Sequence, residues 1–269
     1  MESCKLSIII LNYKSSGLTR ECLRGLLAAD LKLDHEIIVV DNNSEDNIGA
    51  ILTKEFPQVK FIELEVNRGY AAGNNAGIKQ AQGEYILILN PDITVFAGQI
   101  EKLVDFMENN SRVGLAGPRL VNPDGSLQYS CYKFPKFLLP LYRRTWLGET
   151  TKAQGELDEY MMKKWDHKNN RVVDWLLGAC LITRRSALSE VGLLDTRYFL
   201  YVEDTDWCRR FVQKQWEVWY VAEVELVHFH ERQSAEAPWL IALFSKIAWI
   251  HIASWLKYFW KWRKITNSK

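Results

Sequence analysis

The first half of the chain alternates short apolar runs with amphipathic stretches. The apolar runs predict buried strands at residues 6–11, 36–40, 59–64, 85–89 and 113–121. Helical patterns lie between several of them, at 16–29, 71–81 and 98–109. Because strand and helix alternate, we expect an α/β fold with an open, mostly parallel sheet and helices on both faces.

The second half is less regular. Residues 133–170 mix proline, aromatic and charged residues without a clear period, which favours a mobile loop or lid. An apolar stretch at 172–182 restores order, and helices are expected to start near Arg185 and after Glu203. The segments 216–221 and 224–229 are typical of two paired strands.

Composition narrows the class of protein. The 269 residues are 48% hydrophobic and carry a formal net charge of +1, which is ordinary for a globular protein and gives no general attraction to nucleic acid. The five cysteines are scattered, as in a protein of a reducing compartment. The apolar runs are too short for a secretory signal or a membrane span, so a cytoplasmic location is expected.

The charge is unevenly distributed, since residues 237–269 carry +6 and the rest of the chain carries −5. Five of the eleven tryptophans also lie in this tail, and a polar stripe runs along it at Ser254, Lys257, Lys261 and Lys264. This pattern predicts a basic amphipathic helix over 238–269, lying on the anionic inner face of a cell membrane. A helix packed on the core or on another subunit is the alternative.

Polar residues follow four of the predicted strands: Asn12-Tyr13, Asp41-Asn42-Asn43, Asn67-Arg68-Gly69 and Asn90-Pro91-Asp92. Open α/β sheets bind ligands beyond the carboxyl ends of their strands. There, Asp92 can hold a divalent cation on a diphosphate, and Arg68 can pair with phosphate. Asp41 can accept a hydrogen bond from a base or a ribose, although both aspartates also suit helix caps. No GxGxxG fingerprint follows the first strand.

Two further groups suggest catalysis. Glu203-Asp204-Thr205-Asp206 places three carboxylates at the start of a predicted helix, where repulsion raises a pKa toward that of a general base. An acidic helix N-terminus is the alternative, and Asp206 can be structural while Asp204 is catalytic. His228 and His230 share one face of a strand near these carboxylates, which suits a metal ligand.

The ordered set of motifs resembles the family 2 inverting glycosyltransferases with the GT-A fold, and among them the bacterial rhamnosyltransferase-like branch. The motifs span residues 5–234 and are SIIILNY, VVDNNS, NRGYAAGNNAG, LNPD, WLLGACLITRR, VGLLDTRYFLYVEDTDWCRR and HFHERQS. The QxxRW signature and the membrane spans of polysaccharide synthases are missing. The resemblance implies a GT-A domain over 1–237, with a nucleotide-binding half at 1–121 and an acceptor-binding half at 122–237.

The resemblance also implies roles for individual residues. The nucleotide-sugar donor would be bound by Asn12, Tyr13, Asp41, Asn43, Asn67, Arg68, Gly69, Asn75, Asn90 and Asp92. Asp204 would be the general base with Glu203 beside it, and Mg²⁺ or Mn²⁺ would lie on Asp92 with His228 or His230. Asn90 stands where the family's metal motif often has Asp. Trp175, Gly178 and Ala179 would line the acceptor or sugar pocket.

The function implied is inverting transfer of a sugar to a polyprenyl-diphosphate-linked saccharide in cell-surface polysaccharide (cell-wall or O-antigen) synthesis. The resemblance favours dTDP-rhamnose as donor, with UDP sugars as an alternative. A nucleotidyltransferase and a non-catalytic nucleotide-sugar binding module are the competing functions. The former needs a phosphate loop after the first strand, of which residues 11–18 are a weak version, and the latter needs no general base. The expected partners are the donor, the lipid-linked acceptor and a membrane surface, with a homodimer left open.

Overall fold

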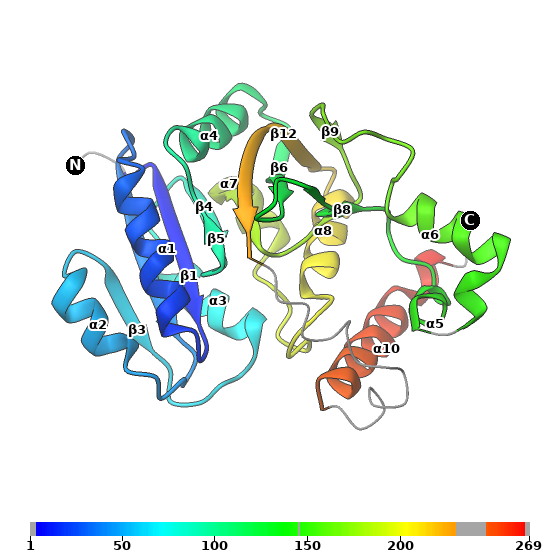
Figure 1. Cartoon of the computed structure of the whole chain (residues 1–269), viewed down its shortest axis with the longest axis horizontal. Coiled ribbons are helices and arrows are strands. Elements are labelled where there is room, and N and C mark those ends of the chain that lie inside the picture. The colour runs from blue at the N-terminus through cyan, green and yellow to red at the C-terminus, as the bar shows by residue number, and fades with distance from the viewer. Residues whose placement is uncertain (1–3, 145, 230–245, 267–269) are drawn as a thin grey trace.

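The computed structural model describes residues 4–144, 146–229 and 246–266. In this part of the chain ten strands form one sheet, in the order β3-β2-β1-β4-β11-β6-β12-β5, with β7 beside β6 and β9 beside β12 (Figure 1). The strands are β1 (Leu6–Asn12), β2 (His35–Asp41), β3 (Lys60–Glu63), β4 (Tyr85–Leu89), β5 (Ile93–Thr94), β6 (Val113–Val121), β7 (Leu127–Gln128), β9 (Arg171–Val172), β11 (Cys180–Arg184) and β12 (Glu217–His228). β8 (Cys131–Tyr132) and β10 (Trp175–Leu176) form a separate pair.

Helices cover both faces of the sheet, as its alternating side chains require. In β1, Ile8 and Ile10 pack with α1 (Ser16–Ala28), α2 (Ile48–Glu55) and α4 (Gln99–Asn109). Ile9 and Leu11 pack on the opposite side with α3 (Tyr70–Gln80), α7 (Arg185–Val191) and α8 (Glu203–Gln213). Because both faces are covered, every residue of β1 is buried. The predicted α/β class and helices on both faces are confirmed.

One reversed strand decides where the two halves of the chain meet. β1, β2, β3 and β4 run parallel to one another, and β6 runs parallel to β12. β11 lies between β4 and β6 and is antiparallel to both. Its first residue, Cys180, therefore pairs with Leu89, the last residue of β4. The segment before β11 thus lies at the carboxyl edge of the parallel strands, which is also the edge where β12 ends at His228.

Two predictions for the second half are wrong. Residues 216–221 and 224–229 are not paired with each other, because β12 runs through both as one strand beside β6. A register shift between Val221 and Glu225 places the exposed Glu223 in an irregularity of the strand and not in a hairpin turn.

The region 133–170, expected to be a loop, contains α5 (Leu139–Arg144), a 3₁₀ turn (Trp146–Glu149) and α6 (Thr151–Tyr160). The side chain of Thr150 caps α6 by accepting a hydrogen bond from the N–H of Ala153. Tyr160 packs against Tyr132 at the end of α6, with 5.1 Å between ring centroids. Helices this short present too few turns for a clear sequence period.

The C-terminal helix α10 (Lys246–Thr266) packs on the protein beside α5 (Figure 1). Part of its polar stripe contacts the protein: the buried Ser254 donates to the carbonyl of Leu200, and the exposed Lys257 donates to the carbonyl of Arg197. The stripe was expected to face lipid head groups, and in the described residues it satisfies polar groups of the protein instead. None of the described helices is long and apolar enough to cross a membrane.

Candidate active site

The ends of β1 and β2 form the first part of the site. Asn12 and Asp41 are neighbours in the register, and the Asn12 amide donates to the Asp41 carboxylate over 2.8 Å. Both side chains are buried. Beside them, a cavity of about 360 Å³ is lined by Asp41, Glu45, Asp46, Asn47, Phe61 and Glu63, among others. The predicted base-binding edge is thus a hollow lined by carboxylates, suited to N–H or hydroxyl donors of a nucleoside.

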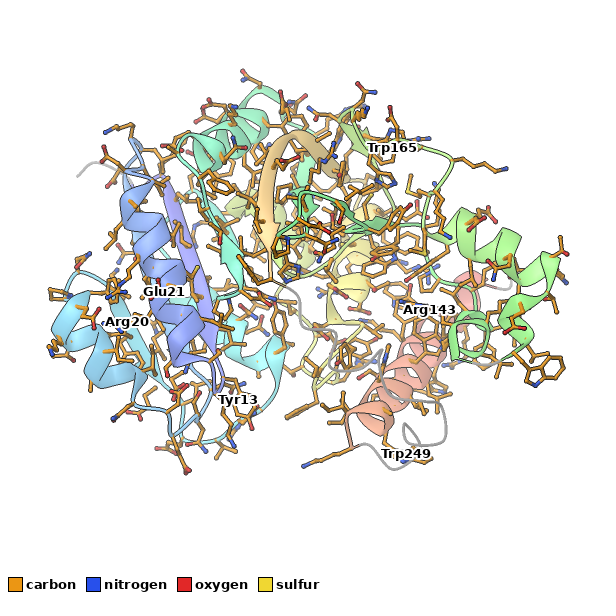
Figure 2. All side chains as sticks on the ribbon, viewed as in Figure 1. Tyr13, Arg20, Glu21, Arg143, Trp165 and Trp249 are labelled. Carbon is orange, nitrogen blue, oxygen red and sulfur yellow. The ribbon has the colours of Figure 1, made fainter. Side chains whose placement is uncertain are left out.

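Other predicted donor contacts surround this edge. Tyr13 is exposed beyond the end of β1, where Figure 2 labels it, and Asn43 and Arg68 are exposed as well. Asn67 accepts hydrogen bonds from Asn42 and from the N–H of Gly69. These side chains remain accessible to a ligand at the carboxyl edge.

The turn before α3 is fixed by a close backbone approach. Gly69 has φ +92°, and a Cβ there would lie 2.1 Å from the carbonyl oxygen of Phe199. Only glycine fits this position. Asn75 in α3 uses its amide differently from the prediction, because it donates to the carbonyl of Leu194 and accepts from the same residue's N–H. Both contacts join α3 to the chain just before α8.

Asp92 and His228 meet although they are far apart in the sequence. His228 Nε2 lies 3.3 Å from Asp92 Oδ2, and Gln128 contacts the other ring nitrogen over 2.6 Å. Asp92 Oδ1 is buried and has no hydrogen-bond partner among the described residues. No group of three or more cysteine, histidine or acidic side chains suited to a metal occurs in the described ranges. His230 lies outside them.

As metal ligands, Asp92 and His228 nevertheless fit a hard cation that also binds the phosphate oxygens of a substrate. Mg²⁺ at phosphate sites commonly takes one or two carboxylates and completes its coordination with phosphate oxygens and water. Asp92 supplies a free carboxylate oxygen at the carboxyl edge, and Gln128 holds the ring of His228 in place. Asn90 directs its side-chain oxygen to the hydroxyl of Tyr70.

Asp204 is held in place from two sides. The N–H of Gly178 donates to Asp204 Oδ2 over 3.0 Å, and the N–H of Thr205 donates to Oδ1 over 2.6 Å. Burial raises the pKa of Asp204, whereas these two N–H groups oppose the rise. Asp204 is thus a carboxylate with a fixed direction and a raised pKa, as a general base requires.

Glu203 lies beside it in a different environment. Its Oε2 is buried without a hydrogen-bond partner in the described residues. Burial raises the pKa of Glu203 well above its ordinary value, and the neighbouring Asp204 carboxylate raises it further. Two adjacent buried carboxyls cannot both be ionised cheaply, so Glu203 holds its proton more readily than Asp204 does.

A chain of hydrogen bonds joins the two carboxylate regions. The buried hydroxyl of Tyr70 lies 3.0 Å from Asn90 Oδ1 and 2.6 Å from the carbonyl oxygen of Gly178. The N–H of Gly178 in turn holds Asp204. Next to it, the N–H of Asn90 donates to the carbonyl of Ala179 over 2.8 Å. The base candidate is therefore attached to Gly178, and the loop after β4 is attached to Ala179 directly and to Gly178 through Tyr70.

The predicted acceptor residues divide into two kinds. Gly178 and Ala179 contribute backbone groups to the site, as described above. Trp175 is buried and stacks on Tyr132, with 4.5 Å between ring centroids, and its indole N–H donates to the carbonyl of Lys133. It supports the wall behind the site.

Comparison with known proteins identifies the family. The profile of glycosyl transferase family 2 matches residues 7–191, which is more than half of the chain. The chain belongs to glycosyltransferase family 2. Asp41, Asp92 and Gly178 all lie within the matched range, whereas Asp204 and His228 follow it.

Curated relatives of this family 2 glycosyltransferase include rhamnosyltransferases. An N-acetylglucosaminyl-diphospho-decaprenol L-rhamnosyltransferase of Mycobacterium tuberculosis is 29% identical over 213 residues, covering 75% of this chain and 69% of the relative. A rhamnosyltransferase of Escherichia coli strain K12 is 25% identical over 271 residues, covering 97% and 94%. The chain thus belongs to the rhamnosyltransferase-like branch.

A solved structure shares the fold. A mannosyltransferase from Pyrobaculum calidifontis in complex with GDP-Man and Mn²⁺ matches with a TM-score of 0.58 at 17% identity. The match covers 86% of this chain and 58% of the mannosyltransferase, so the chain spans little more than half of that protein. The transferase therefore has the GT-A fold.

The structure adds residues that the sequence did not single out. Tyr70 lies in a quoted motif, but no local pattern shows that its hydroxyl reaches Asn90 and Gly178. Gln128 belongs to a turn-like segment, and only the fold brings it to His228. A search for buried polar side chains at strand ends misses both, since each depends on contacts across 20 to 108 residues of sequence.

The raised pKa of Glu203 makes stability depend on pH. The folded protein binds this proton more tightly than the unfolded chain, so the stabilisation present at low pH is lost as pH rises from the unfolded pKa, ~4.3, toward the folded pKa. We expect Glu203→Gln to remove this loss, since Gln stays neutral. In urea unfolding, the free energy of unfolding of the variant relative to that of the wild type should rise between pH 5 and pH 8, by up to ~1.4 kcal/mol per pH unit.

Glu65→Gln is the matched control, because Glu65 is exposed and the same chemical change should leave the pH dependence as in the wild type. If Glu203→Gln and the wild type instead show parallel curves, Glu203 does not hold its proton in the folded state.

Proposed function

We propose that the protein is an inverting glycosyltransferase that moves a sugar from a nucleoside-diphosphate sugar to a hydroxyl of a lipid-linked saccharide, with Asp204 as general base. The observation that carries this proposal is that Asp204 and Asn90 are attached to neighbouring residues, Asp204 to Gly178 and Asn90 to Ala179. It fixes the base relative to the loop that carries Asp92. Single displacement needs such a fixed relation, since attack comes from the side opposite the leaving group.

In this reaction Asp204 takes the proton of the acceptor hydroxyl as the oxygen attacks the anomeric carbon, and the nucleoside diphosphate leaves with the bonding electron pair. Asp204 suits this step because its carboxylate is oriented by two N–H groups and its pKa is raised by burial. Glu203, which retains its proton, limits the negative charge beside the base.

The proposed metal site is Asp92 with His228. A divalent cation there would neutralise charge on the diphosphate leaving group. Support comes from the free, buried Oδ1 of Asp92, and from the Mn²⁺ bound by the mannosyltransferase that shares the fold. Asp41 and Asn12 would hold the nucleoside, with Tyr13, Asn43, Asn67, Arg68 and Gly69 around them, and Asn12 would act by fixing the carboxylate of Asp41.

For the donor we propose dTDP-rhamnose and for the acceptor a polyprenyl-diphosphate-linked saccharide. The rhamnosyltransferases of Mycobacterium tuberculosis and Escherichia coli support this choice, the former acting on a decaprenol-linked N-acetylglucosamine as its name states. A UDP-sugar donor is the second candidate, and a panel of donors distinguishes the two.

Replacing the base tests the function. Asp204→Asn should lower kcat by about 10²- to 10⁴-fold, the usual contribution of general acid–base catalysis, while donor binding followed by thermal shift is retained. Wild-type transfer should occur with dTDP-rhamnose in the presence of Mg²⁺ or Mn²⁺. Asp105→Asn, which changes an exposed carboxylate of α4, should match the wild type. Asp204→Asn retaining wild-type turnover would refute the assignment.

We also propose that α10 rests on a membrane surface, which would bring the enzyme to a lipid-linked acceptor. The supporting face is the outer one, because Trp249, Leu256 and Trp260 lie at helical spacing and are 56%, 54% and 66% exposed. Figure 2 labels Trp249 near the start of the helix. Phe137 and Leu138, which precede α5, add exposed apolar groups next to it. Lys246 and Arg263 flank the face at its two ends, as anionic lipid head groups would favour.

A double substitution tests the membrane role. Trp249→Ser with Trp260→Ser should weaken co-sedimentation with phosphatidylglycerol vesicles by roughly 100-fold, given ~1.5 kcal/mol or more per buried large apolar side chain. Phe61→Ser changes an exposed aromatic on the distant edge strand β3 and should bind vesicles like the wild type. Equal binding by the double variant and the wild type would show that this face does not contact lipid.

A further inference from the structure

Asp206 is a buried carboxylate in α8, two residues after the proposed base. It is fully buried and receives hydrogen bonds from four side chains. Arg210 of the same helix donates over 3.0 Å, and the hydroxyl of Tyr198 lies 3.2 Å away. The other two donors come from α10, where Lys261 Nζ lies 2.8 Å from Oδ2 and the indole N–H of Trp262 lies 2.9 Å from Oδ1.

The attachment of α10 extends beyond this carboxylate. Lys261 also donates to Asp195, in the segment that leads into α8, over 2.8 Å. Arg209 of α8 donates to the hydroxyl of Tyr258 in α10 and lies against the Trp262 ring, 5.3 Å from its centroid. Tyr258 is fully buried in this contact. Lys261 therefore joins α8, the segment before it and α10 at one point.

The start of α8 depends on such outside support. Tyr201 and Val202, the two residues before the helix, both have positive φ, at 69° and 74°. Neither is glycine, and a β-branched residue in this region stores strain that the surroundings must hold. Val202 also provides no side-chain cap for the helix. The first turn of α8, which carries Glu203 and Asp204, is thus held by contacts to other elements.

We propose that Lys261 and Trp262 of the C-terminal helix position the catalytic base through Asp206, which makes Asp206 a positioning residue for Asp204. This inference rests on the proposed function of Asp204. Arg210 of the same helix still pairs with Asp206 when Lys261 is replaced, so the contact that is lost is the one that ties α8 to α10. A displacement of ~1 Å at a reacting group costs up to about 100-fold in rate.

The test compares two lysines of the same helix. Lys261→Met and Lys257→Met each remove one positive charge and keep the length of the side chain, but Lys257 donates to the carbonyl of Arg197 and not to Asp206. Transfer is measured in detergent micelles, with donor and a polyprenyl-diphosphate saccharide varied separately. Lys261→Met should lower kcat by about 10- to 100-fold with the donor KM within about twofold, whereas Lys257→Met should stay near the wild type.

Two further variants separate positioning from simple loss of structure. Lys261→Arg keeps a charged donor and should recover part of the lost kcat. Asp206→Asn combined with Lys261→Met should lower kcat by less than the product of the two single effects, since the Lys261–Asp206 contact is shared by both changes. Melting temperatures of all variants are recorded, and hydrogen exchange of the Thr205 and Asp206 amides should quicken in Lys261→Met and not in Lys257→Met.

The proposal is overturned if Lys261→Met keeps wild-type kcat and amide exchange, or if the two lysine variants lose activity equally. Failure of the proposed function gives a different result: Asp204→Asn then retains turnover, whatever the lysine variants do.

Discussion

The hydrogen bond from the Gly178 N–H to the Asp204 carboxylate joins the segment before β11 to the first turn of α8. Gly178 reaches this position because β11 is antiparallel between β4 and β6, so that its start lies at the edge where the parallel strands end. Gly178 lies directly against the base candidate, since an added Cβ would lie 3.4 Å from Asp204 Oδ2, at ordinary contact distance. The reversed strand thereby brings the N–H of Gly178 and the base candidate to the edge where β1, β2 and β4 end.

The sequence predicts the first half of this arrangement well. Buried strands that end in Asn12, Asp41 and Asn90 follow from apolar runs, and parallel pairing places their ends together. The reversal of β11 does not follow from any local pattern, because a buried strand has the same composition in either direction. The hydroxyl of Tyr70 and the amide of Gln128 were missed for a related reason, as their partners are distant in sequence.

The C-terminal helix has contacts that its sequence pattern does not predict. The sequence predicts the stripe of Ser254, Lys257, Lys261 and Lys264 as one face of a basic helix that lies on anionic head groups. In the structure Lys261 donates to the buried Asp206 and the exposed Lys257 donates to the carbonyl of Arg197, while Trp249 and Trp260 are exposed. Long amphipathic side chains allow this, because the charged tip of a lysine reaches a carboxylate beneath an apolar surface. One helix can therefore contact the catalytic helix and a lipid surface on opposite sides.

The central claim is that Asp204 activates an acceptor hydroxyl for a single displacement. The stereochemistry of the product tests it most directly, because one displacement inverts the anomeric carbon and two displacements restore it. We expect NMR of the isolated product, from the one-bond carbon–proton coupling at the transferred anomeric centre, to show the configuration opposite to that of the donor. A product with the donor's configuration would contradict the account.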